Sequence, residues 1–176
     1  MKSVELLACY RWSTLHRDQP RKAFSCGQVD VDVWLKTKAL QHQDKRLSVT
    51  KVLLAQNAIA GFYTLATGQV DFGDLPTSIA KGLPRRALPV AVLAWLGISS
   101  QVQGQGLGRI LLSQALLDCH TAGQTFAFTA VVLDCVNDQA KAFYQRFDFQ
   151  EVPGRPYRLY LSAAELASLL EAESQA

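Results

Sequence analysis

The alternation of apolar and polar residues along the chain predicts a mixture of strands and helices. Runs rich in β-branched and aromatic residues, bounded by turn residues, are typical of strands. We expect strands at residues 4–10, 49–55, 59–70, 91–98, 126–133, 149–152 and 157–161. Apolar residues spaced three or four apart are typical of helices. We expect helices from Asp30, at residues 77–81 and 109–117, from Asn137 and from Ser162. Residues 11–22 are polar and predict a loop.

A glycine-rich segment follows the most apolar of these predicted strands. Residues 91–98 are apolar throughout, as expected for a central strand that is buried on both faces. The next segment is Gln103-Gly104-Gln105-Gly106-Leu107-Gly108, and an amphipathic helix begins at Arg109. Backbone N–H groups at a helix start have no helical partner and lie at the positive end of the helix dipole. The segment therefore predicts an anion-binding loop to which Arg109 contributes. Its spacing differs from those of nucleotide P-loops and dinucleotide-binding turns.

Composition and charge are those of a globular protein. The chain has 176 residues, of which 49% are hydrophobic and 19% charged, and its net charge is +3. This length and composition predict one domain spanning residues 1–176. The mild positive charge is compatible with an anionic partner but does not require one.

The cysteines and the apolar runs bear on compartment and cofactors. The four cysteines, at positions 9, 26, 119 and 135, form no Cys-x-x-Cys pair, so we expect neither a metal site nor a disulfide. We interpret them as buried thiols in a reducing compartment. The start of the chain lacks a signal-peptide core, and no apolar run is long enough to span a bilayer. We therefore expect a cytoplasmic protein without a membrane partner.

Two motifs resemble those of the GNAT acetyltransferases. The glycine segment contains Gln-x-x-Gly-x-Gly, the pyrophosphate-binding loop of that family. Residues 137–149 resemble the family segment Asn-x-x-Ala-x-x-Phe-Tyr-x-x-x-Gly-Phe, with Asp148 in place of the glycine. Aspartate tolerates the left-handed backbone expected there. The resemblance implies an α/β GNAT fold, in which helices cover both faces of a mixed, mostly antiparallel sheet that is splayed at its fourth and fifth strands.

The same resemblance implies an acetyl-CoA-dependent N-acetyltransferase that needs no metal. It implies cofactor contacts by Leu96, Ile98, Gln103, Gly104, Gln105, Gly106, Leu107, Gly108, Arg109, Asn137 and Tyr144. It also implies that Tyr144 is the general acid that protonates the departing thiolate, since a phenol with a pKa near 10 is protonated at neutral pH. The alternative for Tyr144 is a structural aromatic residue of its helix.

A narrower resemblance is to the GNAT toxins of type II toxin–antitoxin systems. It is carried by Phe24-Ser25-Cys26-Gly27 and by Gly61-Phe62-Tyr63-Thr64-Leu65. It implies acetylation of the amino group of aminoacyl-tRNA, control by a ribbon-helix-helix antitoxin, and a homodimer. Two positions depart from the toxin pattern: Ser25 stands where these toxins usually have Asp, and Trp95 where they usually have Arg. Trp95 indicates a changed acceptor, or an aromatic that stacks on a base or an adenosine.

Several residues are candidates for contact with a tRNA acceptor: Lys36, Lys45, Arg46, Tyr63, Arg85, Arg86 and Trp95. Lysine and arginine would neutralise phosphates, and a solvated surface is the alternative reading of these charges. Tyr63 is either an ordinary strand aromatic or part of a pocket wall. Two other functions remain open from the sequence: an enzyme that acetylates a small amine or a protein amine, and a CoA-binding interaction protein without turnover.

Overall fold

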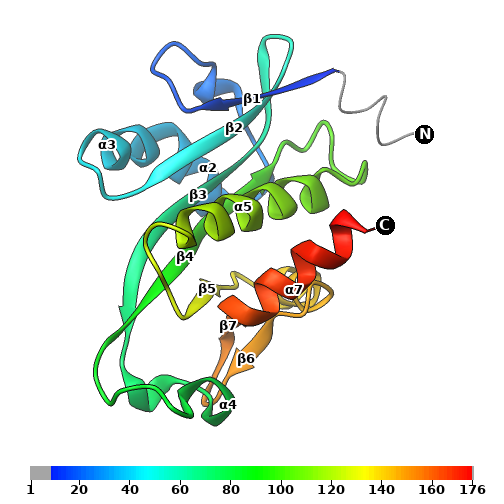
Figure 1. The fold of residues 1–176 in the computed structure, drawn as a ribbon. Helices are drawn as coiled ribbons and strands as arrows, with labels where there is room; N and C mark the ends of the chain where they lie inside the picture. The colour runs from blue at the N-terminus through cyan, green and yellow to red at the C-terminus, as the bar shows by residue number, and fades with distance from the viewer. Residues whose placement is uncertain (1–8, 176) are drawn as a thin grey trace. The chain divides into compact units, whose positions relative to one another are not determined.

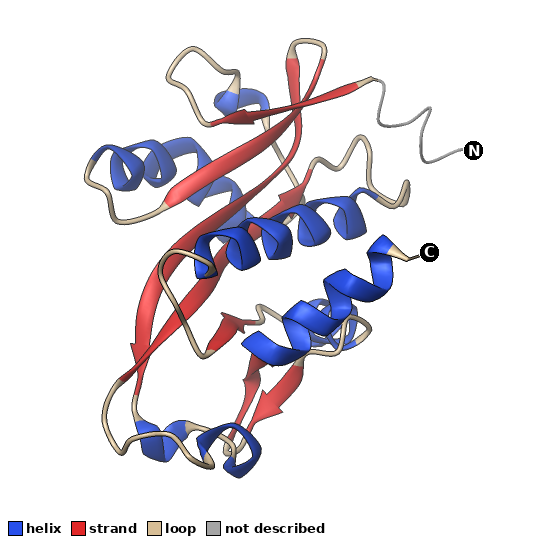
Figure 2. Ribbon diagram, viewed as in Figure 1, coloured by secondary structure: helices blue, strands red, loops and turns tan. Residues whose placement is uncertain are grey.

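The computed structural model describes residues 9–175 (Figures 1 and 2). The strands are β1 (Tyr10–Thr14), β2 (Val49–Ala55), β3 (Ala58–Val70), β4 (Leu88–Ile98), β5 (Ala130–Asp134), β6 (Gln150–Val152) and β7 (Arg155–Ser162). The helices are α2 (Val29–Val33), α3 (Ala39–Asp44), α4 (Thr77–Ala80), α5 (Leu107–Gly123), α6 (Asp138–Gln145) and α7 (Ala163–Ser174). Shorter elements are the 3₁₀ turns η1 (Arg21–Ala23) and η3 (Phe72–Asp74) and the π-helix η2 (Trp34–Lys38).

The strands form one mixed sheet in the order β1-β2-β3-β4-β5-β7-β6. The pairs β1–β2, β2–β3, β5–β7 and β6–β7 are antiparallel, whereas β4 and β5 are parallel. The parallel register joins Ala91 with Val131 and Val92 with Val132. The mixed, mostly antiparallel sheet expected from the sequence is confirmed, while its splaying at β4 and β5 stays a prediction.

The chain divides into two compact units, and each is discontinuous in sequence. The first unit comprises residues 1–66 and 94–115, and the second comprises residues 67–93 and 116–176. The boundaries fall inside β3, β4 and α5, so these three elements belong partly to each unit. Whether residues 1–176 behave as the single domain expected from the sequence stays a prediction.

The core of the first unit lies between the helical run α2–η2–α3 and the strands β2 and β3 (Figure 1). Val31, Leu35 and Ala39 on the helical side are buried in the same apolar cluster as Val52 and Phe62 on the strands. A helix from about Asp30 was expected, and its spacing of apolar residues accounts for this buried face. The π-helix in the middle of the run was not expected.

The second unit contains two capped helices that the sequence predicts. Asn137 caps α6 by accepting a hydrogen bond from the Ala140 backbone N–H at 2.8 Å. Ser162 and Glu165 form a reciprocal capping box at the start of α7, with bonds of 3.1 and 2.9 Å. Asp148 takes the left-handed conformation expected of it, with φ of 66°. Local sequence therefore fixes where both helices begin.

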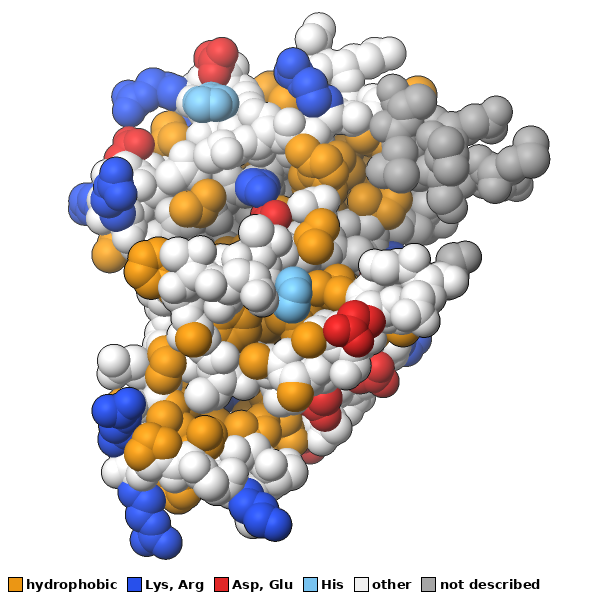
Figure 3. All heavy atoms as spheres, in the orientation of Figure 1, with side chains coloured by type: hydrophobic (Ala, Val, Ile, Leu, Met, Phe, Trp, Pro, Cys, Tyr) orange, Lys and Arg blue, Asp and Glu red, His pale blue; other side chains and the backbone are white. Residues whose placement is uncertain are grey.

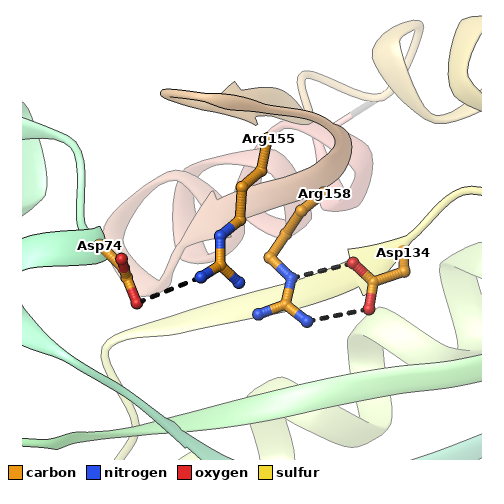
Figure 4. Close-up of polar contacts among 4 residues, drawn as sticks. All are labelled: Asp74, Asp134, Arg155 and Arg158. Carbon is orange, nitrogen blue, oxygen red and sulfur yellow. Dashed lines mark hydrogen bonds and ion pairs between the residues drawn. The ribbon is translucent and has the colours of Figure 1, made fainter.

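Ion pairs on β7 connect further segments of the second unit (Figure 4). Arg158 binds Asp134, at the end of β5, through two hydrogen bonds of 2.9 and 3.0 Å. Arg155 lies 3.7 Å from Asp74 of η3, and thus joins the β3–β4 connection to β7. Because the Asp74 pair is half-exposed, we expect it to add little to stability, while the forked Arg158 pair orients the end of β5.

Three expectations about the elements need correction. The strand expected at residues 4–10 lies mostly outside the described residues, and β1 instead occupies part of the expected loop at residues 11–22. The strand expected from Phe126 begins only at Ala130, and Phe126 is 80% exposed and so lies outside the core. The cysteines are not all buried: Cys9 is exposed and Cys135 is half-buried.

The first prediction concerns the close packing of β4 on the first-unit core. A Cβ atom added at Gly97 would lie 2.8 Å from Val31 Cγ1 and 2.9 Å from Phe62 Cε1. We expect Gly97→Ala to lower the free energy of unfolding by about 1–3 kcal/mol, as for other overpacked cores. Denaturant unfolding measures this change. The matched control is Gly73→Ala, where an added Cβ meets nothing within 4 Å; equal effects in both variants would refute tight packing at Gly97.

Candidate functional site

The second half of β4 is unusually accessible for a central strand. Ala94 is exposed, and Trp95, Leu96 and Ile98 are half-buried, and the register of β4 with β5 covers only Ala91 and Val92, before this half begins. Central strands are ordinarily covered on both faces. The accessible residues include the two, Leu96 and Ile98, at which the sequence predicts contact with the cofactor.

The side chain of Gln103 holds the glycine loop in place. Its amide nitrogen donates one hydrogen bond to the Ile98 carbonyl at 2.9 Å and another to the Cys26 carbonyl at 2.8 Å. The first bond closes the loop onto the end of β4, and the second joins it to the turn before α2. Gln103 therefore positions the loop through its side chain, and its backbone is not needed for this role.

The turn at Phe24–Gly27 is itself held by a carboxylate that the sequence analysis did not single out. Asp32 of α2 accepts a hydrogen bond from the Cys26 backbone N–H at 2.8 Å and another from the Ser25 hydroxyl at 3.1 Å. Gly27 has φ of 87°, which suits glycine. Burial, followed by the hydrogen bond with Asp32, raises the pKa of the Cys26 thiol to about 11. Cys26 is thus a neutral structural residue, as interpreted from the sequence.

The loop itself has the backbone geometry that an anion site needs. Gly104 and Gly106 have φ of 79° and 82°, and a Cβ atom added at either position would meet nothing within 4 Å. Glycine is therefore suited to these positions by its backbone conformation, not by crowding. The loop backbone remains open to a ligand. α5 begins at Leu107, so the first N–H groups of a long helix follow the loop directly. Arg109 is exposed in its first turn. Backbone donors, dipole and cation together can bind a phosphate.

Tyr144 belongs to the second unit and lies near the end of α6. Its ring makes edge contacts with Phe143 and Phe149, at centroid distances of 5.1 and 5.8 Å. Burial, and secondarily the nearby Cys135, raises the pKa of the Tyr144 phenol above its ordinary value. The pKa of the Cys135 thiol is itself raised to about 11 by burial and then by Asp134. Both groups are therefore neutral at physiological pH, and Tyr144 can donate a proton.

The position of α6 is fixed by contacts with the β6–β7 hairpin. Lys141 forms an ion pair with Glu151 of β6, and its ammonium lies 5.5 Å from the centre of the Tyr157 ring. The Tyr157 hydroxyl donates a 2.8 Å hydrogen bond to Asp138. These contacts, together with the Asn137 cap, hold the helix that carries Tyr144.

The basic candidates are distributed over both units. Lys45 and Arg46 are exposed just after α3, and Lys36 is half-buried in η2 of the first unit. Arg85 and Arg86 are exposed in the connection between α4 and β4, where Arg85 lies 5.8 Å from the Phe72 ring centre. Figure 3 shows Lys and Arg side chains over the α4 segment of the second unit. These positions are accessible to a polyanion.

The two aromatic candidates have different surroundings. Tyr63 has no exposed surface and makes an edge contact with Trp12, so its interpretation as an ordinary strand aromatic is favoured over a pocket wall. Trp95 is half-buried and stacks on Trp34, with ring centroids 5.2 Å apart and an interplanar angle of 13°. Asp32 was not singled out from the sequence, because it belongs to no motif, and Trp34 was given no functional role there. In the described part of the chain, no three His, Cys, Asp or Glu side chains are grouped as metal ligands.

The second prediction tests the role of the Gln103 amide. We expect Gln103→Ala to weaken acetyl-CoA binding about tenfold, because the two lost hydrogen bonds position the loop. Gln103→Glu should weaken it at least as much, since a carboxylate has no N–H to donate. Calorimetric titration with acetyl-CoA measures both. Gln101→Ala is the control, since this exposed glutamine lies in the same loop; comparable losses in all three variants would contradict the assigned role.

Comparison with known proteins gives consistent results. A family model described as an acetyltransferase (GNAT) domain matches residues 51–151. A "tRNA-acetylating toxin" of Mycobacterium tuberculosis is 32% identical over 148 residues, which cover 84% of this chain and 89% of that protein.

Solved structures share the fold. AtaT complexed with acetyl-methionyl-tRNAfMet has a TM-score of 0.83 at 21% identity, covering 92% of this chain and 99% of that one. A tyrosine-to-phenylalanine variant of AtaT, bound to the C-terminus of the antitoxin AtaR and to acetyl-CoA, has a TM-score of 0.77 at 18% identity, covering 92% and 98%. The family model and the relative from M. tuberculosis show that this chain belongs to the GNAT acetyltransferases, enzymes that transfer the acetyl group of acetyl-CoA to an amine.

Proposed function

We propose that this enzyme acetylates the α-amino group of aminoacyl-tRNA and thereby acts as a toxin of translation. The observation that carries the proposal is the 32% identity, over most of both chains, with the tRNA-acetylating toxin. The net charge of +3 and the exposed basic residues suit a nucleic-acid acceptor. In an acetylated α-amine the nitrogen lone pair is delocalised into the new amide, so it cannot attack in peptide-bond formation and the modified aminoacyl group cannot accept a growing chain.

In this proposal the glycine loop and the end of β4 bind the cofactor. Backbone N–H groups of residues 104–108 and the start of α5 hold the pyrophosphate, with Arg109 adding charge. The pantetheine arm runs back along β4 past Ile98 and Leu96, using backbone groups as a β-strand partner would. Asn137 contacts the arm from the start of α6. No cofactor contact requires a metal ion.

The chemical step is a direct acyl transfer. The neutral amine of the aminoacyl group attacks the thioester carbonyl carbon, and the resulting tetrahedral intermediate expels the CoA thiolate as the C–S bond breaks. The thiolate takes a proton from Tyr144, the new amide nitrogen loses its extra proton to water, and the tyrosinate is reprotonated from solvent. Positioning of the two substrates supplies most of the acceleration.

The raised pKa of Tyr144 decides how it assists. A thiol has an ordinary pKa near 8.5, lower than that of a phenol, so full proton transfer before C–S cleavage is unfavourable. Tyr144 therefore donates a hydrogen bond to the sulfur as negative charge develops there. Transfer of its proton to the departing sulfur is completed when the tyrosinate is reprotonated from solvent, which has taken up the more acidic proton of the new amide nitrogen.

The acceptor is held mainly through its phosphates. Lys36, Lys45 and Arg46 supply cations from the first unit, and Arg85 and Arg86 supply them from the second. Each contact adds affinity that falls as the salt concentration rises. Tyr63 is left out of this surface because it is buried.

We further propose the biological setting that the toxin resemblance implies. The enzyme acts in the cytoplasm, where charged tRNA is found, as a homodimer that a ribbon-helix-helix antitoxin holds inactive. In the described part of the chain, no helix has the length and apolar character needed to cross a bilayer. Sedimentation of the purified protein, alone and with the product of a neighbouring small reading frame, tests both assembly states.

The third prediction addresses the acceptor and Tyr144 together. With labelled acetyl-CoA and a pool of charged tRNA, the wild type should transfer label to the aminoacyl group. Tyr144→Phe should lower kcat by about a hundredfold to ten-thousandfold, because it removes the proton donor. Acetyl-CoA binding should change little, since only one hydroxyl is lost.

Tyr10→Phe, which removes a phenol hydroxyl from β1, is the matched control and should keep full activity. Unchanged kcat in Tyr144→Phe would remove Tyr144 from the mechanism. Transfer to free amines or peptides but not to charged tRNA would instead favour a small-amine or protein-amine enzyme.

The fourth prediction concerns pH. The acid must be protonated and the amine neutral, so activity should rise with pH as the acceptor amine loses its proton. Burial raises the pKa of Tyr144, so the phenol loses its proton only at a pH above its ordinary pKa of about 10. Single-turnover rates should therefore reach a plateau with no decline up to about pH 10, where a phenol of ordinary pKa would already be half ionised. A descending limb below that pH, absent from Tyr144→Phe, would contradict the raised pKa.

A further inference from the structure

Trp34 and Trp95 form a stacked pair that belongs entirely to the first unit. Their ring centroids are 5.2 Å apart and their planes are inclined by only 13°. Trp34 is 7% exposed, whereas Trp95 is half-buried. The Trp34 ring is thus buried, and the Trp95 ring stacks on it with part of its own surface accessible.

Trp34 is held rigidly from several sides. Its indole N–H donates a 3.0 Å hydrogen bond to the Thr64 hydroxyl, which lies 2.8 Å from the Thr50 hydroxyl, and both threonines are fully buried. The His42 ring meets Trp34 edge-on at a centroid distance of 4.7 Å. A buried tryptophan with a satisfied N–H has one orientation.

The backbone at Trp34 is also unusual. Trp34 is the first residue of the π-helix η2, between α2 and α3. π-helical turns are rare and often mark functional sites. The π-turn and the polar anchoring of Trp34 are independent observations, and both concern the residue on which Trp95 rests.

The place of Trp95 on β4 indicates what it can contact. In the proposed function, the pantetheine arm begins at the glycine loop and runs back past Ile98 and Leu96. The thioester end of the arm therefore comes to the part of β4 occupied by Trp95 and the exposed Ala94. At that end the amine nitrogen of the acceptor meets the thioester. The group nearest to this nitrogen, besides the ester itself, is the side chain of the amino acid whose amine is acetylated.

We propose that Trp95, supported by Trp34, contacts the side chain of the aminoacyl group and makes the enzyme favour tRNA charged with large apolar amino acids. This inference rests on the proposed function. The cluster against which Trp95 packs consists of hydrophobic side chains, and Leu40 packs against the same cluster. A charged aminoacyl side chain would lose hydration against these apolar surfaces, and glycine has no side chain to contact them.

The test uses one tRNA body that an acylating ribozyme charges with different amino acids, so that only the aminoacyl group varies. Acetylation of phenylalanyl, leucyl, glycyl and aspartyl forms is followed in single-turnover reactions. We expect the wild type to prefer phenylalanyl and leucyl over aspartyl by about tenfold or more in kcat/KM. Trp95→Ala should lose most of this preference while retaining reaction with glycyl-tRNA.

Two further variants distinguish a change in amino-acid preference from a loss of folding. Trp95→Arg keeps a planar group that can stack on Trp34 and adds a positive charge. It should fold normally and shift the ranking toward the aspartyl form. Trp12→Ala removes another half-buried tryptophan of the first unit, which packs edge-on against Tyr63, and should leave the ranking unchanged. Acetyl-CoA binding, measured for every variant, should match that of the wild type.

The outcomes separate the inference from the function on which it rests. A wild type that acetylates all four forms equally, or prefers aspartyl, overturns the inference alone. Loss of rate on all four forms to the same degree in Trp95→Ala gives Trp95 a purely structural role and also overturns it. No transfer to any charged tRNA, with acetyl-CoA still bound, overturns the proposed function and the inference together.

Discussion

The two hydrogen bonds donated by the Gln103 amide are the interaction on which the cofactor loop depends. A single nitrogen reaches the carbonyls of Cys26 and Ile98, so the turn before α2, the end of β4 and the glycine loop must keep one relative arrangement. Asp32 holds the same turn from the other side through the Cys26 N–H. The Gln103 side chain thus holds the loop in place. The loop glycines take left-handed conformations, which glycine adopts without strain.

Burial governs the chemistry in the second unit. It raises the pKa values of Tyr144 and Cys135, so both groups are neutral hydrogen-bond donors. A neutral phenol suits a reaction in which charge appears on sulfur only as the C–S bond breaks. Lys141 and Asp138 are charged, but both are engaged with the β6–β7 hairpin and serve to hold α6.

Features that depend on neighbouring residues could be predicted from the sequence. The caps at Asn137 and Ser162 and the left-handed Asp148 are examples, since each is decided within one turn of chain. Features that depend on packing between distant segments could not. The Trp34–Trp95 stack joins a helix to a strand far along the chain, and the burial of Tyr63 depends on Trp12 of β1. Strand alternation gives the two faces of β3 but does not say what covers each face.

In the proposed function, the acetyl group of acetyl-CoA ends on the α-amine of an aminoacyl-tRNA. The most direct measurement is mass spectrometry of aminoacyl-adenosines released by nuclease from total tRNA, after induction of the enzyme in growing cells. We expect N-acetyl-aminoacyl-adenosine to appear as translation stops. Translation arrest without that species, or acetylation found only on free amines or on protein, would contradict the proposed function.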